Sequence, residues 1–284
     1  MGRDLFCMAK MLQDALKIIE RYKSTTPHYG ELLDILGEIL ILREEYRRKM
    51  TKVIFSIDEE LLDKKINGGL PLIDFSTGQF DLTEPKKYFT ALLEIAEKRA
   101  PGETKEVLQM LEEGSFNFEK MISDSFNSVQ EDDSADEIDD DVIDLVDLFL
   151  EESLRPALEK VVEKYGKAVA KEGWAEGYCP ICGKEPKIGE IREEEGRRFL
   201  FCTQCGYEWR FMRIKCPFCG NEEQQTLAYF SIEGEEKYRV DVCNECKRYI
   251  KIVDFRETEE EANLDVEDIA TLHLDMLANE EGYD

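Results

Sequence analysis

Residues 179–220 read CPICGKEPKIGEIREEEGRRFLFCTQCGYEWRFMRIKCPFCG, and a further cysteine pair, CNEC, occupies residues 243–246. Two residues between paired cysteines let both sulfur atoms face one ion from a single tight turn, and two such turns complete a tetrahedral four-sulfur site. The four Cys-x-x-Cys pairs therefore predict two metal sites. The predicted ligands are Cys179, Cys182, Cys202, Cys205, Cys216, Cys219, Cys243 and Cys246.

The spacing of the pairs favours sequential pairing. Nineteen residues separate Cys182 from Cys202 and twenty-three separate Cys219 from Cys243, which leaves room for a hairpin in each gap. Only ten residues separate Cys205 from Cys216, so the two ribbons are expected to be neighbours. Crossed pairing, first with third and second with fourth, is the alternative. A four-sulfur tetrahedron holds either zinc or a single iron, so we expect two ions of one or the other metal.

The residue after each pair belongs to the same turn. Glycine follows three of the pairs, at positions 183, 206 and 220, where such a turn often needs a positive φ. Lys247 occupies this position in the fourth pair. The sequence therefore predicts a strained or differently shaped fourth turn.

The first 172 residues have mostly helical patterns. Apolar residues recur at steps of three and four in residues 5–19 and 32–40, which is typical of amphipathic helices. Gly, Pro and Asp turn signals predict a loop over residues 66–85, and the acidic stretch 131–141 is expected to be a solvated loop. A long helical pattern begins at residue 142, and Pro156 is a candidate point of division.

Short β-like runs lie between the cysteine pairs, at residues 198–201, 208–212, 227–230, 238–240 and 249–253. After residue 257 an acidic segment leads to one final helix. Its apolar side is expected to contain Leu264, Ile269, Leu272, Met276 and Leu277.

The fold class expected from these patterns is α+β. A mostly helical domain covers residues 1–172, two adjacent metal ribbons cover 173–256, and an acidic C-terminal segment with a helix covers 257–284. The ribbon region has few apolar residues, so we expect it to depend on its ions and the helical domain to survive chelation.

Charge and composition limit the possible functions. The net charge is −27, of which −15 lies in residues 1–172, −1 in 173–256 and −11 in 257–284. Such a total opposes binding to free nucleic acid. No apolar run approaches the ~18 residues of a membrane helix, and the N-terminus lacks a signal-peptide pattern, so a cytoplasmic protein is expected. The sequence contains no recognisable nucleotide or hydrolase motif, and we expect no enzymatic activity.

The order of parts resembles the FdhE family of formate dehydrogenase accessory proteins. The similarity is sharpest over residues 178–254, especially in residues 208–216 and in CNEC with Tyr249 and Lys251, and it extends to residues 274–283. The resemblance implies a cytoplasmic protein with rubredoxin-like ribbons beside a helical domain. It also implies binding to the catalytic subunit of a molybdenum- or tungsten-dependent formate dehydrogenase, which needs the protein for activity.

Basic residues concentrate in the ribbon region, which can therefore face an acidic partner surface. The candidate contacts are Trp209, Arg213, Lys215, Tyr249 and Lys251, although the two aromatic residues can instead pack over the ribbons. Two other functions remain open. Iron in a four-sulfur site can cycle one electron, so the alternative is a rubredoxin-like electron-transfer or thiol-redox protein. A nucleic-acid-binding ribbon is opposed by the charge.

Overall fold

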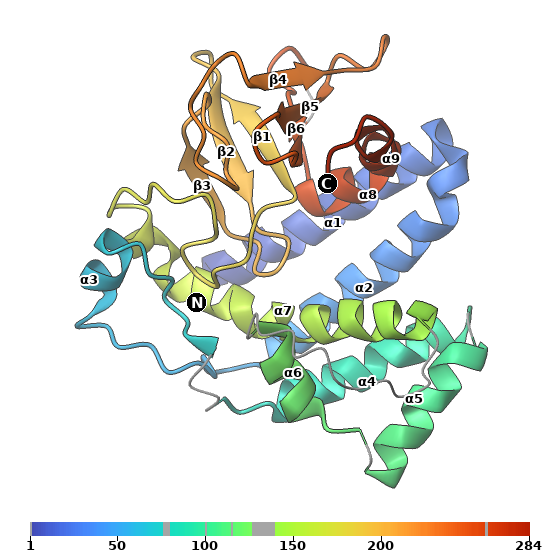
Figure 1. Ribbon diagram of the computed structural model, residues 1–284. Coiled ribbons are helices and arrows are strands. Elements are labelled where there is room, and N and C mark those ends of the chain that lie inside the picture. Colours follow the sequence, from blue (N-terminus) through green and yellow to red (C-terminus); the bar gives the residue numbers. More distant parts are fainter. Residues whose placement is uncertain (1, 76–79, 100, 115, 127–139, 259–260) are drawn as a thin grey trace.

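A computed structural model describes residues 2–75, 80–99, 101–114, 116–126, 140–258 and 261–284 of the chain. A layer of helices from the first part of the chain lies against a twisted sheet from the second part, and two short C-terminal helices lie beside the sheet (Figure 1). This arrangement confirms the α+β class. The acidic stretch 131–141 falls almost wholly outside the described residues.

The helical layer begins with two long antiparallel helices and ends with the longest helix of the chain. Its elements are α1 (Gly2–Thr25), the short 3-10 turn η1 (Pro27–Tyr29), α2 (Gly30–Lys49), α3 (Leu62–Asn67), α4 (Thr83–Glu97), α5 (Pro101–Glu113), α6 (Phe118–Phe126) and α7 (Asp140–Val169). Of the apolar residues predicted to form buried stripes in α1 and α2, Leu12, Leu16, Ile19, Leu36 and Leu40 pack in one cluster. Leu32 is 44% exposed, so the predicted stripe of α2 is wrong at this residue. Helix α5 begins at Pro101, because proline is well tolerated in the first turn of a helix.

Helix α7 runs through Pro156 without a break, contrary to the division considered from the sequence. Proline removes one backbone hydrogen bond, at a cost of about 3 kcal/mol. The flanking residues Leu154, Ala157, Leu158 and Val161 are at most 1% exposed, and this burial offsets the loss. Packing therefore overrides the local preference of proline.

A six-stranded sheet carries the ribbons. Its strands are β1 (Ile188–Arg192), β2 (Arg197–Phe201), β3 (Glu208–Phe211), β4 (Leu227–Phe230), β5 (Tyr238–Cys243) and β6 (Tyr249–Val253), in the spatial order β3-β2-β1-β6-β5-β4. Within each ribbon the strands are antiparallel. The two ribbons join where β1 pairs in parallel with β6, with Ile188 opposite Lys251. The expected adjacent ribbons thus form one continuous sheet.

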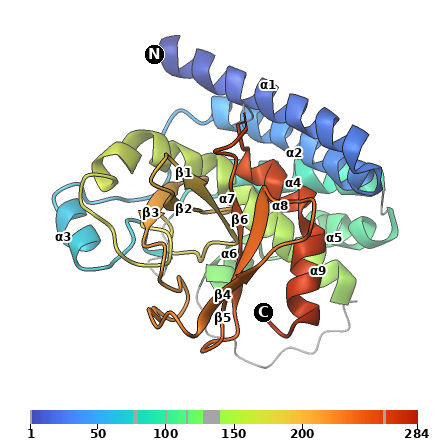
Figure 2. The same cartoon turned by 90° about the horizontal axis from the view of Figure 1, so that it is seen from above.

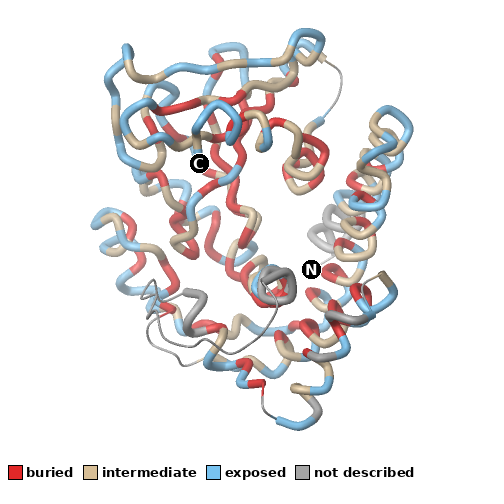
Figure 3. The backbone as a smooth tube through the Cα atoms, turned by 45° about the vertical axis from the view of Figure 1, so that its right-hand side comes forward, coloured by how far each residue is buried: buried red, intermediate tan, exposed pale blue. Residues whose placement is uncertain are grey.

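The first ribbon shares its core with the helical layer. One cluster of buried side chains extends from Tyr88 and Phe89 of α4 through Leu158 of α7 to Cys179, Leu200 and the residues around them. In Figure 3 the buried residues follow the inner strands and the inward sides of the helices, whereas exposed residues lie mainly on the outer loops and turns. The sequence analysis expected the helical domain to survive chelation. Because the helices and site A share one core, we expect instead that loss of the ion at site A also destabilises part of the helical layer.

The C-terminal segment forms two helices where the sequence analysis predicted one. Helix α8 (Leu264–Ala270) ends at Thr271, and α9 (Leu272–Glu280) follows. Figures 1 and 2 show α8 beside α1 and α2 as well as the sheet. The buried residues of the two helices include Val266, Leu274 and Ala278, whereas Met276 is 63% exposed. The predicted apolar side is therefore wrong at Met276, because the break at Thr271 changes the direction of the second helix.

Candidate metal centres

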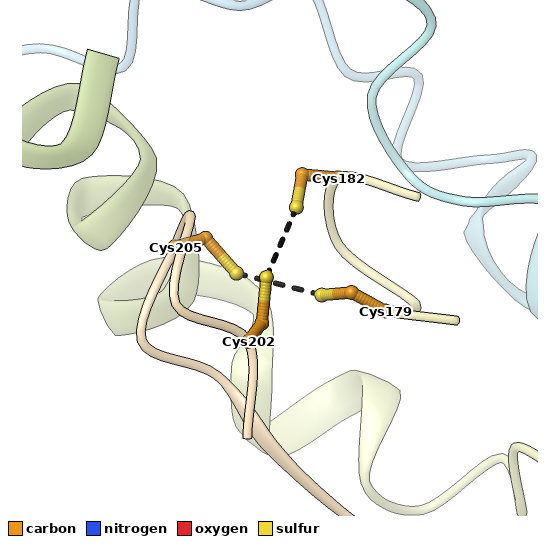
Figure 4. A group of neighbouring side chains, drawn as sticks. All are labelled: Cys179, Cys182, Cys202 and Cys205. Carbon is orange, nitrogen blue, oxygen red and sulfur yellow. Dashed lines mark hydrogen bonds between the residues drawn. The ribbon is translucent and has the colours of Figure 1, made fainter. Parts of the chain in front are cut away.

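The cysteine pairs come together in sequence order, as the spacing favoured. We call the group of Cys179, Cys182, Cys202 and Cys205 site A, and the group of Cys216, Cys219, Cys243 and Cys246 site B. In each group the four sulfur atoms all lie within 4.8 Å of one another. Figure 4 shows that two turns of the chain present the sulfur atoms of site A to a common centre.

All four turns have the same backbone hydrogen bonds. The amide of the first cysteine donates to the carbonyl five residues later, and the amide of the residue after the second cysteine donates to the carbonyl of the first, at 2.8–3.1 Å. These bonds fix the direction of both sulfur atoms. Lys247 has a φ of 61°, close to the 74° of Gly220, so the fourth turn is strained but not differently shaped.

The sulfur spacing of site A fits a tetrahedral ion. Cys179 Sγ lies 3.4 Å from Cys205 Sγ, and Cys182 Sγ lies 3.4 Å from Cys202 Sγ. A metal–sulfur distance of about 2.3 Å gives a tetrahedron whose edges are about 3.8 Å. A modest outward shift of the sulfur atoms would therefore place them around zinc or iron.

Burial of the four cysteines in site A also makes a bound cation necessary if all four are to be thiolates. Burial raises the pKa of Cys179 and Cys205 well above the usual thiol value. For Cys202, burial opposes ionisation, but hydrogen bonds from the neighbouring thiols lower its pKa well below that value. Burial thus opposes ionisation of Cys179 and Cys205 when no cation is near. Four thiolates at this depth require a bound cation.

Helix α7 and the segment before α4 hold site A from outside. Arg155 Nη1 donates to the carbonyls of Cys202 and Thr203, and Arg155 Nη2 lies 3.0 Å from Asp265 of α8. The amide of Leu72 donates to Pro180 O at 2.9 Å, and that of Ile73 to Ile181 O at 3.0 Å. The sequence analysis missed both contacts. A basic residue within the apolar pattern of α7 was the available signal for Arg155, and nothing local marked residues 72–73.

Site B has a wider spacing and is more open to solvent. Its short sulfur–sulfur distances are 3.7 Å, from Cys216 to Cys246 and from Cys219 to Cys243, close to the tetrahedral edge given above. Cys219 is exposed and Cys246 is partly exposed, whereas every cysteine of site A is buried. The two sites are therefore unequal in their access to solvent.

The environment of site B gives Cys216 and Cys243 different pKa values. Burial raises the pKa of Cys216 to about 12. For Cys243, burial opposes ionisation, but the side chain of Asn221 and the amides of Cys246 and Glu245 lower its pKa to about 7. The Asn221 amide lies 3.5 Å from Cys243 Sγ and also donates to Thr226 Oγ1.

A close backbone approach links the two sites. A Cβ atom on Gly177, just before site A, would lie 1.8 Å from the carbonyl oxygen of Pro217 inside site B. Only glycine allows this contact. The sequence analysis treated Gly177 as a mark of the domain boundary and did not predict the contact.

The other candidate residues lie in different surroundings. Arg213 is exposed and Lys215 is partly exposed. Trp209 is 4% exposed, and its indole N–H donates to Glu176 O. Lys251 is 2% exposed and lies between Asp268 and Asp275, while the hydroxyl of Tyr249 donates to Asp275. As placed, Trp209 and Lys251 serve packing and ion pairing inside the protein.

Comparisons with known proteins agree with this arrangement. Residues 178–213 match the model of the FdhE central domain, and residues 214–284 match that of the FdhE C-terminal domain. "Protein FdhE homolog" from Aquifex aeolicus is 30% identical over 272 residues, which cover 95% of this chain and 91% of that protein. "Protein FdhE" from Salmonella arizonae is 36% identical over 121 residues, which cover 42% of this chain and 38% of that protein. The crystal structure of the FdhE protein from Pseudomonas aeruginosa superposes with a TM-score of 0.70 at 26% identity, covering 98% of this chain and 92% of that one.

The fold and the two cysteine groups define a protein with two four-cysteine ribbons, each able to hold a metal ion, and an attached helical layer. Its similarity to the Aquifex protein over nearly the whole length goes further. The chain belongs to the FdhE family, the formate dehydrogenase accessory proteins. None of the described helices is both long and apolar enough to cross a membrane.

Proposed function

We propose that this chain is a cytoplasmic, non-enzymatic assembly factor that binds the catalytic subunit of a molybdenum- or tungsten-dependent formate dehydrogenase and is needed for its activity. Membership of the FdhE family is the observation that carries this proposal. The chain would contribute a binding surface rather than a catalytic step. In the described part of the chain, the clustered thiols are those of sites A and B, where bound ions would occupy them.

We propose that three parts of the chain have different structural roles. Residues 1–172 supply the helical support, residues 173–256 supply the metal ribbons, and residues 257–284 connect the two through α8 and α9. One ion of zinc or iron in each site would fix the ribbon turns. The binding surface would then be rigid before the partner arrives, which lowers the entropy cost of association.

The docking surface is proposed to lie on residues 210–215, which we call the docking strip. Arg210 and Arg213 are exposed, and neither forms an ion pair with the described residues. Between them Met212 is 56% exposed, and Ile214 beyond them is 49% exposed. Positive charge beside exposed apolar groups complements an acidic and apolar partner surface.

A groove of about 940 Å³ borders the docking strip on the side of the helices. Its lining includes Val169 and Trp174 from the end of the helical layer as well as Trp209 and Met212. A partner segment could place apolar side chains there while its acidic groups face Arg213 and Lys215. The proposed contacts on this surface are therefore Arg213 and Lys215, with Trp209 in the wall of the groove. Tyr249 and Lys251 instead contact Asp275 of α9.

Charge reversal tests the docking surface. The double variant Arg213→Glu/Lys215→Glu should capture the catalytic subunit of the same organism about tenfold less well under reducing conditions, because the complementary charges become repulsive. The matched control is Lys52→Glu/Lys64→Glu, which reverses two exposed charges on the helical half. Both variants should keep two ions per chain.

Failure of the intact chain to capture the subunit would overturn the proposed function. An equal loss in the control variant would move the contact away from the docking strip. Loss of metal in the Arg213→Glu/Lys215→Glu variant would show that these residues act structurally.

Rubredoxin-like electron transfer is the second candidate, and the exposed Cys219 of site B favours it because electron transfer needs an accessible centre. Anaerobic purification followed by metal analysis and voltammetry separates the two functions. Iron with a reversible one-electron step would support the redox function, whereas zinc alone would exclude it and leave the binding proposal intact.

A further inference from the structure

A pocket of about 290 Å³ lies beside site B and shares residues 213–215 of its lining with the large groove. Two ligand cysteines, Cys216 and Cys243, form part of its wall. Apolar groups of β4 and of the site B turn, including Tyr229 and Phe218, form another part. The pocket is therefore a hollow next to the metal centre, with room for a small ligand.

The charged residues of the pocket are mostly basic. They comprise Arg198, Arg213, Lys215, Arg239 and Arg248 together with one carboxylate, Asp241. Arg248 is paired with Glu185 at 2.7 Å, and Lys215 lies 3.4 Å from Glu222. Arg198 and Arg239 both pair with Asp241, and Arg213 has no ion pair within the described ranges. One carboxylate therefore balances the charge of three arginines.

The two inner guanidinium groups are incompletely satisfied. Arg198 is 3% exposed, and its Nε atom has no hydrogen-bond partner among the described residues. Arg239 Nε lies 2.8 Å from Asp241 Oδ1 but makes no hydrogen bond there. Burial, together with the nearby Arg239, lowers the pKa of Arg198 although Asp241 opposes this shift. The other nitrogen atoms of Arg198 donate to Asp241, Met212 O and Lys215 O, so a further acceptor would be needed only at the Nε atoms.

The charge of the metal centre does not by itself explain where these cations lie. A divalent ion with four thiolates carries a net charge of about −2, which nearby cations offset. Site A is the more buried centre, yet the guanidinium that contacts it, Arg155, is already paired with Asp265 and Glu159. If counter-charge alone explained the arginines, the more buried site A would have the larger number of them.

We propose that the pocket beside site B binds an oxyanion, either a carboxylate or a phosphate group. A guanidinium group donates two parallel hydrogen bonds to such anions, which makes arginine the preferred residue for them. Arg239 and Arg213 would hold the charged group, and Tyr229 and Phe218 would contact any apolar part attached to it. The proposal needs no bound partner protein, but it shares Arg213 with the proposed docking strip, so anion binding is measured on the chain alone.

Isothermal titration of the metal-loaded chain tests the proposal. Inorganic phosphate and acetate are the two probes, each titrated in chloride buffer of matched ionic strength. Phosphate binding alone would identify a phosphate site, and acetate binding would extend it to carboxylates. No saturable binding of either probe would overturn the proposal.

Three variants locate the site. Arg213→Gln should weaken binding about tenfold, because it removes a charge-assisted hydrogen bond. Its matched control, Arg210→Gln, changes an exposed arginine outside the pocket and should bind like the wild type. Asp241→Asn should bind more tightly, because it removes the competing carboxylate. Equal effects of the two arginine variants, or weaker binding by a folded, metal-loaded Asp241→Asn, would show that the arginines only offset the charge of the centre.

Discussion

At the scale of single residues, the position after each cysteine pair decides how well the turn is formed. Gly220 and Lys247 occupy this position in the two turns of site B, with φ values of 74° and 61°. Lysine in this conformation costs roughly 1–2 kcal/mol relative to an ordinary backbone. The intact hydrogen bonds of the fourth turn show that it keeps the shape of the other three turns and that Lys247 adopts the strained φ.

Opposite substitutions at these two positions should therefore have opposite effects. Lys247→Gly should raise the free energy of unfolding by up to about 1 kcal/mol, because glycine adopts a positive φ without strain. Gly220→Ala should lower it by about 1 kcal/mol, since its Cβ would make only an ordinary contact with Lys215 Cε at 3.9 Å and the backbone penalty remains. Urea unfolding of the zinc-loaded proteins measures both. Effects of the same sign would contradict this explanation.

At the scale of elements, α8 connects the helical layer to the sheet through one buried carboxyl group. Glu267 of α8 is fully buried, and its Oε2 atom accepts hydrogen bonds from Tyr22 of α1 at 2.6 Å and Tyr238 of β5 at 2.8 Å. Burial raises the pKa of Glu267, and the two hydroxyl groups only partly offset this shift. The folded state thus favours the protonated carboxyl.

This connection predicts a pH dependence with a definite sign. A carboxyl whose pKa is raised on folding contributes stability below its unfolded value, and this contribution is lost as the pH rises through the folded value. The wild type should therefore gain stability relative to Glu267→Gln when the pH falls from neutral toward 4.5, the ordinary pKa of a glutamate carboxyl. Urea unfolding at several pH values measures the difference. The control is Glu281→Gln, which changes an exposed carboxyl after α9 and should leave the difference flat. A gain in the opposite direction would contradict the assignment.

Local sequence patterns predicted most elements but not how they join. The apolar runs at 198–201, 227–230 and 249–253 lie within observed strands, whereas β1 was missed because Gly189 and two charged residues interrupt its pattern. The parallel pairing of β1 with β6 depends on residues more than fifty positions apart, which no local period reveals. The continuity of α7 through Pro156 and the break at Thr271 likewise depend on packing.

The cysteine spacing predicted the two sites and their pairing, but not their inequality. Cysteine spacing determines which sulfur atoms can meet, and both groups have the same type of spacing. Burial depends on where each ribbon lies relative to α7, and the contacts of Arg155 and residues 72–73 occur only at site A. The chemical difference between the sites is therefore a property of the tertiary structure.

At the scale of the whole molecule, the two ions should have different effects when they are lost. Site A belongs to the core that also contains α4 and α7, whereas site B lies at the far ribbon with Cys219 exposed. A chelator should therefore reach site B first. Loss of the ion at site A should then unfold the ribbon together with part of the helical layer, because they share one core.

Both tryptophans report on site A. The indole N–H of Trp174 donates to Tyr178 O at 2.8 Å, directly before Cys179, and that of Trp209 donates to Glu176 O at 3.3 Å. Their emission should stay constant while site B loses its ion and should shift when site A opens. Two variants assign the signals to the sites. Cys219→Ser, in site B, should hold one ion and keep the wild-type emission. Cys182→Ser, in site A, should show the shifted emission and lose part of the helical signal.

The most direct test is native mass spectrometry of the anaerobically purified chain during chelation, with tryptophan emission and circular dichroism recorded in parallel. We predict two ions per chain that leave in two steps, first from site B and then from site A. The tryptophan emission and the helical signal should change only in the second step. A chain that holds fewer than two ions, or that loses both ions and its helical signal in one step, would contradict the existence of two unequal metal centres.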